Sequence, residues 1–154
     1  MYFFLLVVCL YRGHIMPKLL TMPIPASADL FQLADMCAAF AVELVESTDT
    51  AESLALCGRL SFALTALRPL SDSFPPPHLV ELLTADERPA PCVPDCWVDS
   101  YLLVDYAQSL TQALLSCALP RGATVELTGL LHDLIMLMAD YLKQPYLERE
   151  AGHE

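Results

Sequence analysis

The chain has 154 residues, of which 55% are hydrophobic and 18% charged, and its formal net charge at pH 7 is −11. From Met22 onward six Lys and Arg stand against nineteen Asp and Glu, a formal charge of −13, because Arg12 and Lys18 lie upstream. A body of this charge repels nucleic-acid phosphates, which argues against direct nucleic-acid binding and favours a basic protein partner or simple solubility. The length suits one domain, and the Leu- and Ala-rich, Gly-poor composition favours helices.

The N-terminal run Tyr2–Tyr11 (YFFLLVVCLY) contains ten apolar or aromatic residues, which is too few to cross a membrane. It also lacks the basic start and the prompt small-residue cleavage site of a signal peptide. Translation from Met16 or Met22 fits these residues better, so we expect residues 1–21 to be an extension with few contacts to the domain. The domain is predicted over residues 22–146, with a frayed tail over 147–154.

Two amphipathic helices with a short polar joint are predicted in the first half of the chain. Apolar residues recur at three- and four-residue steps over 28–46, after Ser27 as the N-cap. A polar turn at 47–50 leads to a second helix, which should end at Arg68 because Pro69 follows. Together they form a predicted αα-hairpin.

A Pro-rich crossover over 70–94, with a short helix at 78–84, separates this hairpin from a second one. Asp95 is predicted to cap the third long helix, which ends before Pro120. A tight turn at 120–122 and a last helix from Thr124 to Pro145 complete the pattern. The predicted fold class is therefore all-α, a bundle of four main helices formed by two αα-hairpins and a Pro-rich crossover.

The predicted buried stripes follow the helical period. In the third long helix the stripe contains Leu103, Tyr106, Leu110, Leu114 and Cys117. In the last helix it contains Leu127, Leu130, Leu131, Leu134, Leu137, Met138, Tyr141 and Leu142. Cys37, Cys57 and Cys117 are expected to be buried free thiols, which suits a reducing cytoplasm as the location.

Few residues have the spacing that a catalytic or metal-binding site requires. Cys92 and Cys96 form the only close cysteine pair; with His78 they would supply three zinc ligands where a structural site needs four, so no metal or other cofactor is expected. His132 and Asp133 lack the partners of a di-iron or zinc-protease motif, since position 129 is Gly. No Gly-x-Ser-x-Gly or phosphate-binding loop occurs. The protein is predicted not to be an enzyme, with a catalyst of unknown class using His132 and Asp133 as an alternative.

The last helix offers the best interface residues. Glu126, Asp133 and Asp140 recur every seven residues on its polar face, and Met136 falls on the same face. Such a row ordinarily only solvates a helix. It also suits docking of a basic protein, or imitation of DNA phosphates by an inhibitor of a nucleic-acid-binding protein, although seven helical residues span about 10.5 Å.

Three segments resemble a known group of sequences. The run from Met22 to Ala34 (MPIPASADLFQLA), the segment 66–69 (ALRP) and the segment 114–120 (LLSCALP) are similar to small uncharacterised proteins of P4-like satellite prophages of enterobacteria. The resemblance covers Met22 to about Pro145. It implies an accessory or regulatory protein of a mobile element that binds another protein, and it assigns no site residue.

Overall fold

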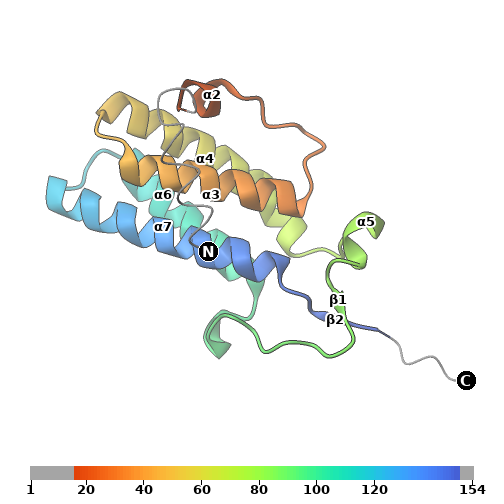
Figure 1. The fold of residues 1–154 in the computed structure, drawn as a ribbon. Helices are drawn as coiled ribbons and strands as arrows, with labels where there is room; N and C mark the ends of the chain where they lie inside the picture. The colour runs from red at the N-terminus through yellow and green to blue at the C-terminus, as the bar shows by residue number, and fades with distance from the viewer. Residues whose placement is uncertain (1–15, 150–154) are drawn as a thin grey trace, which may run out of the picture.

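The computed structural model describes residues 16–149 and shows an all-α bundle (Figure 1). Its four long helices are α3 (Leu30–Glu46), α4 (Thr50–Ser71), α6 (Ser100–Leu115) and α7 (Arg121–Lys143). The shorter elements of the described part are α2 (Met16–Thr21), α5 (Pro77–Val80), the 3-10 turn η1 (Asp95–Trp97) and two strands, β1 (Thr84–Ala85) and β2 (Leu147–Glu148).

The four long helices form a closed ring in which each runs antiparallel to both of its neighbours (Figure 1). Sequence neighbours α3 and α4 pack together, as do α6 and α7; α4 also packs on α6, and α7 returns to α3. The bundle buries one core, whose largest fully enclosed side chains are Phe40, Leu56, Leu60, Leu64, Leu67, Leu83, Leu103, Leu131, Ile135 and Met138. The predicted fold class is confirmed.

The first hairpin begins two residues later than predicted and ends three residues later. Asp29, not Ser27, caps α3: its carboxylate accepts the Gln32 backbone N–H, while the Gln32 side chain accepts the Asp29 N–H. α4 continues through Pro69 to Ser71. Pro69 is exposed in the last turn, so the carbonyl that loses its partner can be hydrated and the helix tolerates the ring.

The second hairpin also starts differently from the prediction. Asp95 opens η1 rather than a long helix, and α6 begins only after Asp99. Pro120 is the N-cap of α7, so residues 121–122 form its first turn and no separate tight turn exists there.

Two residues of the predicted stripe of α6 are exposed. Tyr106 lies against Trp97 at the surface, and Cys117 follows the helix with a φ of 54°. Cys117 is exposed because α6 ends at Leu115, and the chain reverses before the stripe would return to the core. Cys37 and Cys57 are buried, as predicted.

The predicted frayed tail is wrong for its first three residues. β2 pairs in parallel with β1, and the backbone N–H groups of Tyr146 and Leu147 both donate to the Leu83 carbonyl. Arg149 forms ion pairs with Glu81 at 2.8 Å and Asp86 at 3.0 Å. The rest of the predicted tail, 150–154, lies outside the described residues.

The boundary predicted at Met22 also needs correction. α2 packs against α3 and α4, and its Leu19 is buried in the common core. The Arg59 side chain donates a hydrogen bond to the Met22 carbonyl and lies over the Phe40 ring, 5.3 Å from its centroid. Residues 16–21 therefore belong to the packed body, whereas the prediction for residues 1–15 falls outside the described part of the chain.

Candidate protein-binding surface on α7

The outward face of α7 carries the acidic row predicted from the sequence. Glu126, Asp133 and Asp140 are all exposed, with the seven-residue spacing that places them along one line of the helix. The opposite face, including Leu131, Ile135 and Met138, is buried against the bundle. The α7 surface is defined here as Glu126, Asp133 and Asp140 together with the exposed apolar residues Val125, Leu130 and Met136.

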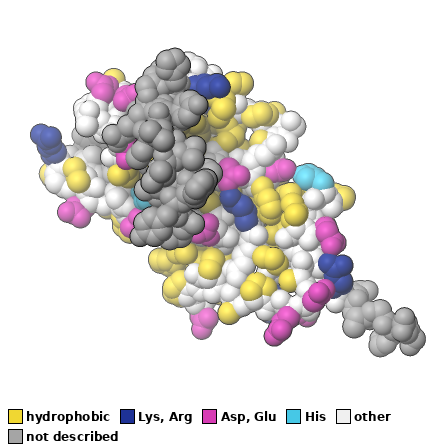
Figure 2. Space-filling model, viewed as in Figure 1, with side chains coloured by type: hydrophobic (Ala, Val, Ile, Leu, Met, Phe, Trp, Pro, Cys, Tyr) yellow, Lys and Arg dark blue, Asp and Glu magenta, His cyan; other side chains and the backbone are white. Residues whose placement is uncertain are grey.

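Apolar side chains flank the acidic row. Val125 is 66% exposed, Leu130 53% and Met136 36%, and they lie on both sides of the row by helical phase. Figure 2 shows the same mixture, with hydrophobic side chains next to Asp and Glu on the visible part of the face that carries α3 and α7. The α7 surface thus combines apolar area with negative charge.

Charged groups of α7 differ in whether they have partners within the bundle. At its end, Lys143 forms an ion pair with Asp35 of α3, and the Tyr141 hydroxyl donates to the Val98 carbonyl at 2.6 Å. Within residues 16–149, Asp133 alone among the three acids of the row has an ion-pair partner, the neighbouring His132. Glu126 and Asp140 thus have no ion-pair partner among the described residues.

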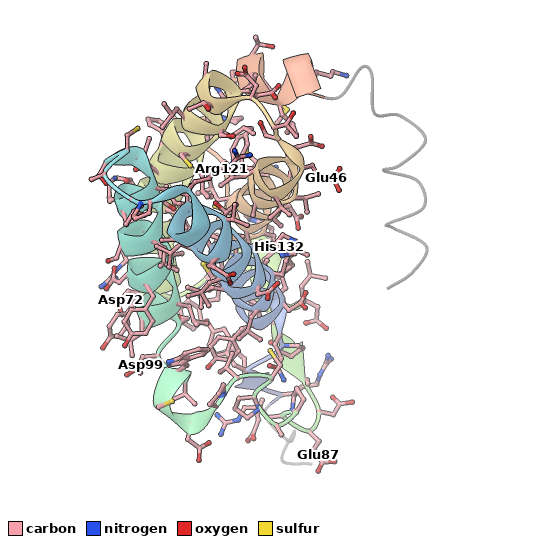
Figure 3. The ribbon with its side chains drawn as sticks, turned by 90° about the vertical axis from the view of Figure 1, so that its left-hand side faces the viewer. Glu46, Asp72, Glu87, Asp99, Arg121 and His132 are labelled. Carbon is pink, nitrogen blue, oxygen red and sulfur yellow. The ribbon has the colours of Figure 1, made fainter. Side chains whose placement is uncertain are left out.

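The catalytic alternative that the sequence offered is a contact between two consecutive residues of α7, His132 and Asp133. His132 Nδ1 lies 2.9 Å from Asp133 Oδ1, and the two are consecutive in the chain (Figure 3 shows His132 midway along α7). Neither residue lines the two hollows that are described below. A general base needs a substrate site and a second reacting group within reach, and neither of these two hollows supplies them to His132 and Asp133.

The residues considered for a metal do not converge. Among the described residues no three His, Cys, Asp or Glu side chains gather closely enough to hold an ion. His78 Nε2 instead lies 2.9 Å from Asp29 at the start of α3. Burial, together with the nearby Asp140 carboxylate, raises the pKa of the Cys92 thiol, which favours the protonated form over the thiolate that a metal binds.

Two shallow hollows lie away from α7. One, of about 390 Å³, lies between the start of α3 and the crossover, where His78 and Phe74 line it. The other, of about 400 Å³, is lined by Ile24, Ala55, Gly58, Arg59 and Phe62 on α4 and the segment before α3. Neither was predicted from the sequence, because both depend on where the segments around α2 and α5 pack.

Met136 was identified from the sequence, but the other two apolar residues of the α7 surface were missed. Leu130 was predicted to be buried, and Val125 was not considered. The signal was available in the helical phase: Leu130 falls on the side of Glu126 rather than of Leu131, so the apolar face was drawn too broadly. Ile135 and Ala139 occupy the buried positions instead.

In the described part of the chain, α7 is also the one helix long and apolar enough to cross a membrane by length and composition, a test that a helix packed in a bundle can also pass. No protein-family model, curated protein or solved structure matches the chain.

Proposed function

We propose that this protein is a non-catalytic binding protein that docks a basic, amphipathic segment of another protein along the α7 surface. The observation that carries the proposal is the placement of exposed Val125, Leu130 and Met136 beside three exposed carboxylates. Exposed apolar area supplies affinity when it is covered, and the acidic row selects and steers a basic partner. A cytoplasmic accessory or regulatory role in a mobile element, which the prophage resemblance implies, is part of this proposal.

The mixed surface favours a protein partner over imitation of DNA. A DNA mimic needs a continuous field of carboxylates, because the mimicked strand is uniformly charged. On α7 the acids are separated by about 10.5 Å along the axis, and exposed apolar side chains flank them on both sides. An amphipathic helix bearing Lys or Arg beside Leu matches both features.

The test uses a synthetic amphipathic helix made of Leu and Lys as the probe. We expect it to bind the parent, and we expect the variant Glu126→Gln, Asp133→Asn, Asp140→Asn to associate roughly tenfold more slowly at low salt. Association rates at low and physiological salt, measured by stopped-flow fluorescence, give the result.

A matched control carries the same charge change elsewhere. The variant Glu87→Gln, Asp95→Asn, Asp99→Asn neutralises three exposed acids between β1 and α6 and has the same net charge as the α7 variant. It should retain the parent's association rate within about twofold if the α7 surface is the docking site, because steering is local at physiological salt. Equal slowing in both variants would show that only net charge matters and would reject the proposal.

A further inference from the structure

Residues of α4 and of the segment before α3 form one of the two hollows, away from the α7 surface. This hollow has a volume of about 400 Å³ and is lined by Ile24, Ala55, Gly58, Arg59 and Phe62. The four α4 residues follow one another at three- and four-residue steps, so they share one face of the helix. An added Cβ at Gly58 would meet no atom within 4 Å. Small residues of α4 therefore leave space beside Arg59 and Phe62.

Arg59 brings a positive charge to this hollow without an acidic partner. Its Nη2 donates to the Met22 carbonyl, and its guanidinium group lies over the Phe40 ring, 5.3 Å from the centroid. Its Nε is enclosed without a hydrogen-bond acceptor, and within residues 16–149 it forms no ion pair. The other Lys and Arg residues of this range either form ion pairs or are exposed, whereas Arg59 is half-buried. Because a half-buried cation has lost part of its hydration, it attracts an anion more strongly than an exposed one does.

The Nη1 atom of Arg59 can bind a ligand, and an aromatic ring lies beside it. Unlike Nε, Nη1 is not enclosed, and no described residue accepts a hydrogen bond from it. Phe62 follows three residues later, about 4.5 Å along the helix axis, and its side chain is 61% exposed. A carboxylate on Arg59 and an apolar group against Phe62 must therefore be close together in the ligand. The last residue of a peptide meets this condition, because its α-carboxylate and its side chain leave the same Cα atom.

The charge of the protein limits which anion can bind here. The net charge of −11 repels polyanions, and the hollow supplies one guanidinium group. A phosphate group or a run of Asp and Glu carries more negative charge than Arg59 compensates, whereas a single carboxylate is balanced. A fatty acid needs an enclosed apolar channel for its chain, and this hollow is shallow.

We infer that this hollow binds the C-terminus of a peptide chain that ends in an apolar or aromatic residue. The α-carboxylate accepts a hydrogen bond from Arg59 Nη1, and the last side chain lies over Gly58 and against Phe62. Capture of a C-terminal carboxylate is a recurring mode of peptide recognition. The inference does not rest on the proposed function, since the site lies on α4 and its ligand is not a basic helix.

The probe is a short fluorescein-labelled peptide of Gly and Ser that ends in Phe with a free carboxylate. We expect it to bind the parent, and we expect the same peptide with a C-terminal amide to bind at least tenfold more weakly, because the amide has no charge to pair with Arg59. Fluorescence anisotropy titrations give both dissociation constants. Equal affinities of the acid and the amide, or no binding of the acid at about 1 mM, would overturn the inference.

A substitution at Gly58 blocks the hollow without altering Arg59. Gly58→Leu has room for its Cβ and raises the helix propensity of α4, so we expect it to fold and to bind the acid peptide at least tenfold more weakly. Gly122→Leu on α7 is the matched control, because Gly122 is also exposed and also has room for a Cβ. It should bind the peptide within about twofold of the parent. Thermal unfolding shows that each variant folds, and parental affinity in a folded Gly58→Leu would contradict the inference.

A further pair of variants tests the aromatic side of the hollow. Phe62→Ala should weaken binding of the acid peptide several-fold, whereas Phe74→Ala, which removes a 75% exposed ring from the other hollow, should leave the affinity unchanged. Equal affinities of the two variants would count against the inference.

Competition with octanoate separates a peptide end from a free carboxylic acid. We expect the unlabelled acid peptide to displace the probe at a concentration at least tenfold lower than octanoate requires. Equal displacement would assign the hollow to a small carboxylic acid and would overturn the inference. None of these measurements uses the Leu and Lys helix, so their outcome is independent of the test of the proposed function.

Discussion

Asp29 joins two parts of the molecule through one carboxylate. One oxygen accepts the Gln32 N–H and caps α3, while the other lies 2.9 Å from His78 Nε2 in the crossover. Asp99 occupies the equivalent N-cap position of α6 but makes no side-chain capping bond. The two residues therefore allow the capping contribution to be measured against an internal reference.

We expect Asp29→Ala to lower the free energy of unfolding by about 1 kcal/mol, the typical contribution of an N-cap. Asp99→Ala should cost a few tenths of a kcal/mol at most, since it removes no capping bond. Urea unfolding of both variants and the parent provides the comparison. Equal losses would show that the capping geometry at Asp29 adds nothing.

The pH dependence of the Asp29 contribution has a definite sign. Burial of the carboxylate opposes ionisation, but hydrogen bonds from the Gln32 N–H and His78 outweigh it and lower the pKa of Asp29 below its ordinary value of 3.8. Because the unfolded chain then binds the proton more readily, the contribution is fully present above about pH 4 and is lost as pH falls through the folded-state pKa. The stability gap between the parent and Asp29→Ala should narrow below pH 4 in acid-unfolding curves, and a gap that widens there would contradict the assignment.

Adjacent leucines on α7 test the phase of that helix. Leu131 is fully buried and Leu130 is 53% exposed. Leu131→Ala should cost roughly 2–5 kcal/mol, because it leaves a cavity in the core, whereas Leu130→Ala should change stability by about 0.5 kcal/mol or less. Thermal or urea unfolding measures both, and similar losses would mean that the helix is rotated from the orientation described.

At the scale of elements, the crossover and the C-terminal strand β2 stabilise each other. β1 and β2 contribute only two residues each. The ion pairs of Arg149 with Glu81 and Asp86 are therefore important for holding the C-terminal segment against the crossover. We expect Arg149→Gln to speed amide hydrogen exchange at residues 84–85 and 147–149 while leaving the unfolding midpoint of the bundle unchanged. Arg121→Gln, at the start of α7, is the control and should leave exchange at the strands as it is in the parent.

Element types were predictable from the sequence because each long helix repeats its apolar residues at the helical period over several turns. Their ends were not, because competing signals stood side by side. Ser27 and Asp29 are both good N-caps, and only the reciprocal bond with Gln32 selects Asp29. Asp95 and Asp99 pose the same choice before α6, and there the packing of Trp97 on Tyr106 accompanies a short 3-10 turn.

The polar row of α7 was predictable for the same reason, since a seven-residue spacing fixes a face wherever the helix lies. Of its apolar flanks only Met136 was identified, because the buried face was drawn too broadly, although the helical phase places Leu130 on the side of Glu126. Leu130 shows the limit: one helical step separates it from the fully buried Leu131.

For the molecule as a whole, the net charge determines which macromolecules it can bind. With a net charge of −11, we expect no binding of a DNA or RNA duplex at micromolar concentration in physiological salt. Fluorescence anisotropy with labelled duplexes checks this, and micromolar binding that weakens with salt would reveal a basic site that the described surface does not show.

Because the four long helices form a closed ring, the chain can be cut at one turn and rejoined at its ends without changing which helices are neighbours. The start of α3 and the end of α7 lie at the same end of neighbouring helices, where Asp35 and Lys143 pair. A linker joining these two points, with new termini opened in the exposed turn at 48–49, would give a circular permutant that keeps every helix–helix contact of the ring. The turn between α3 and α4 is thus a second place at which this ring of four helices can begin.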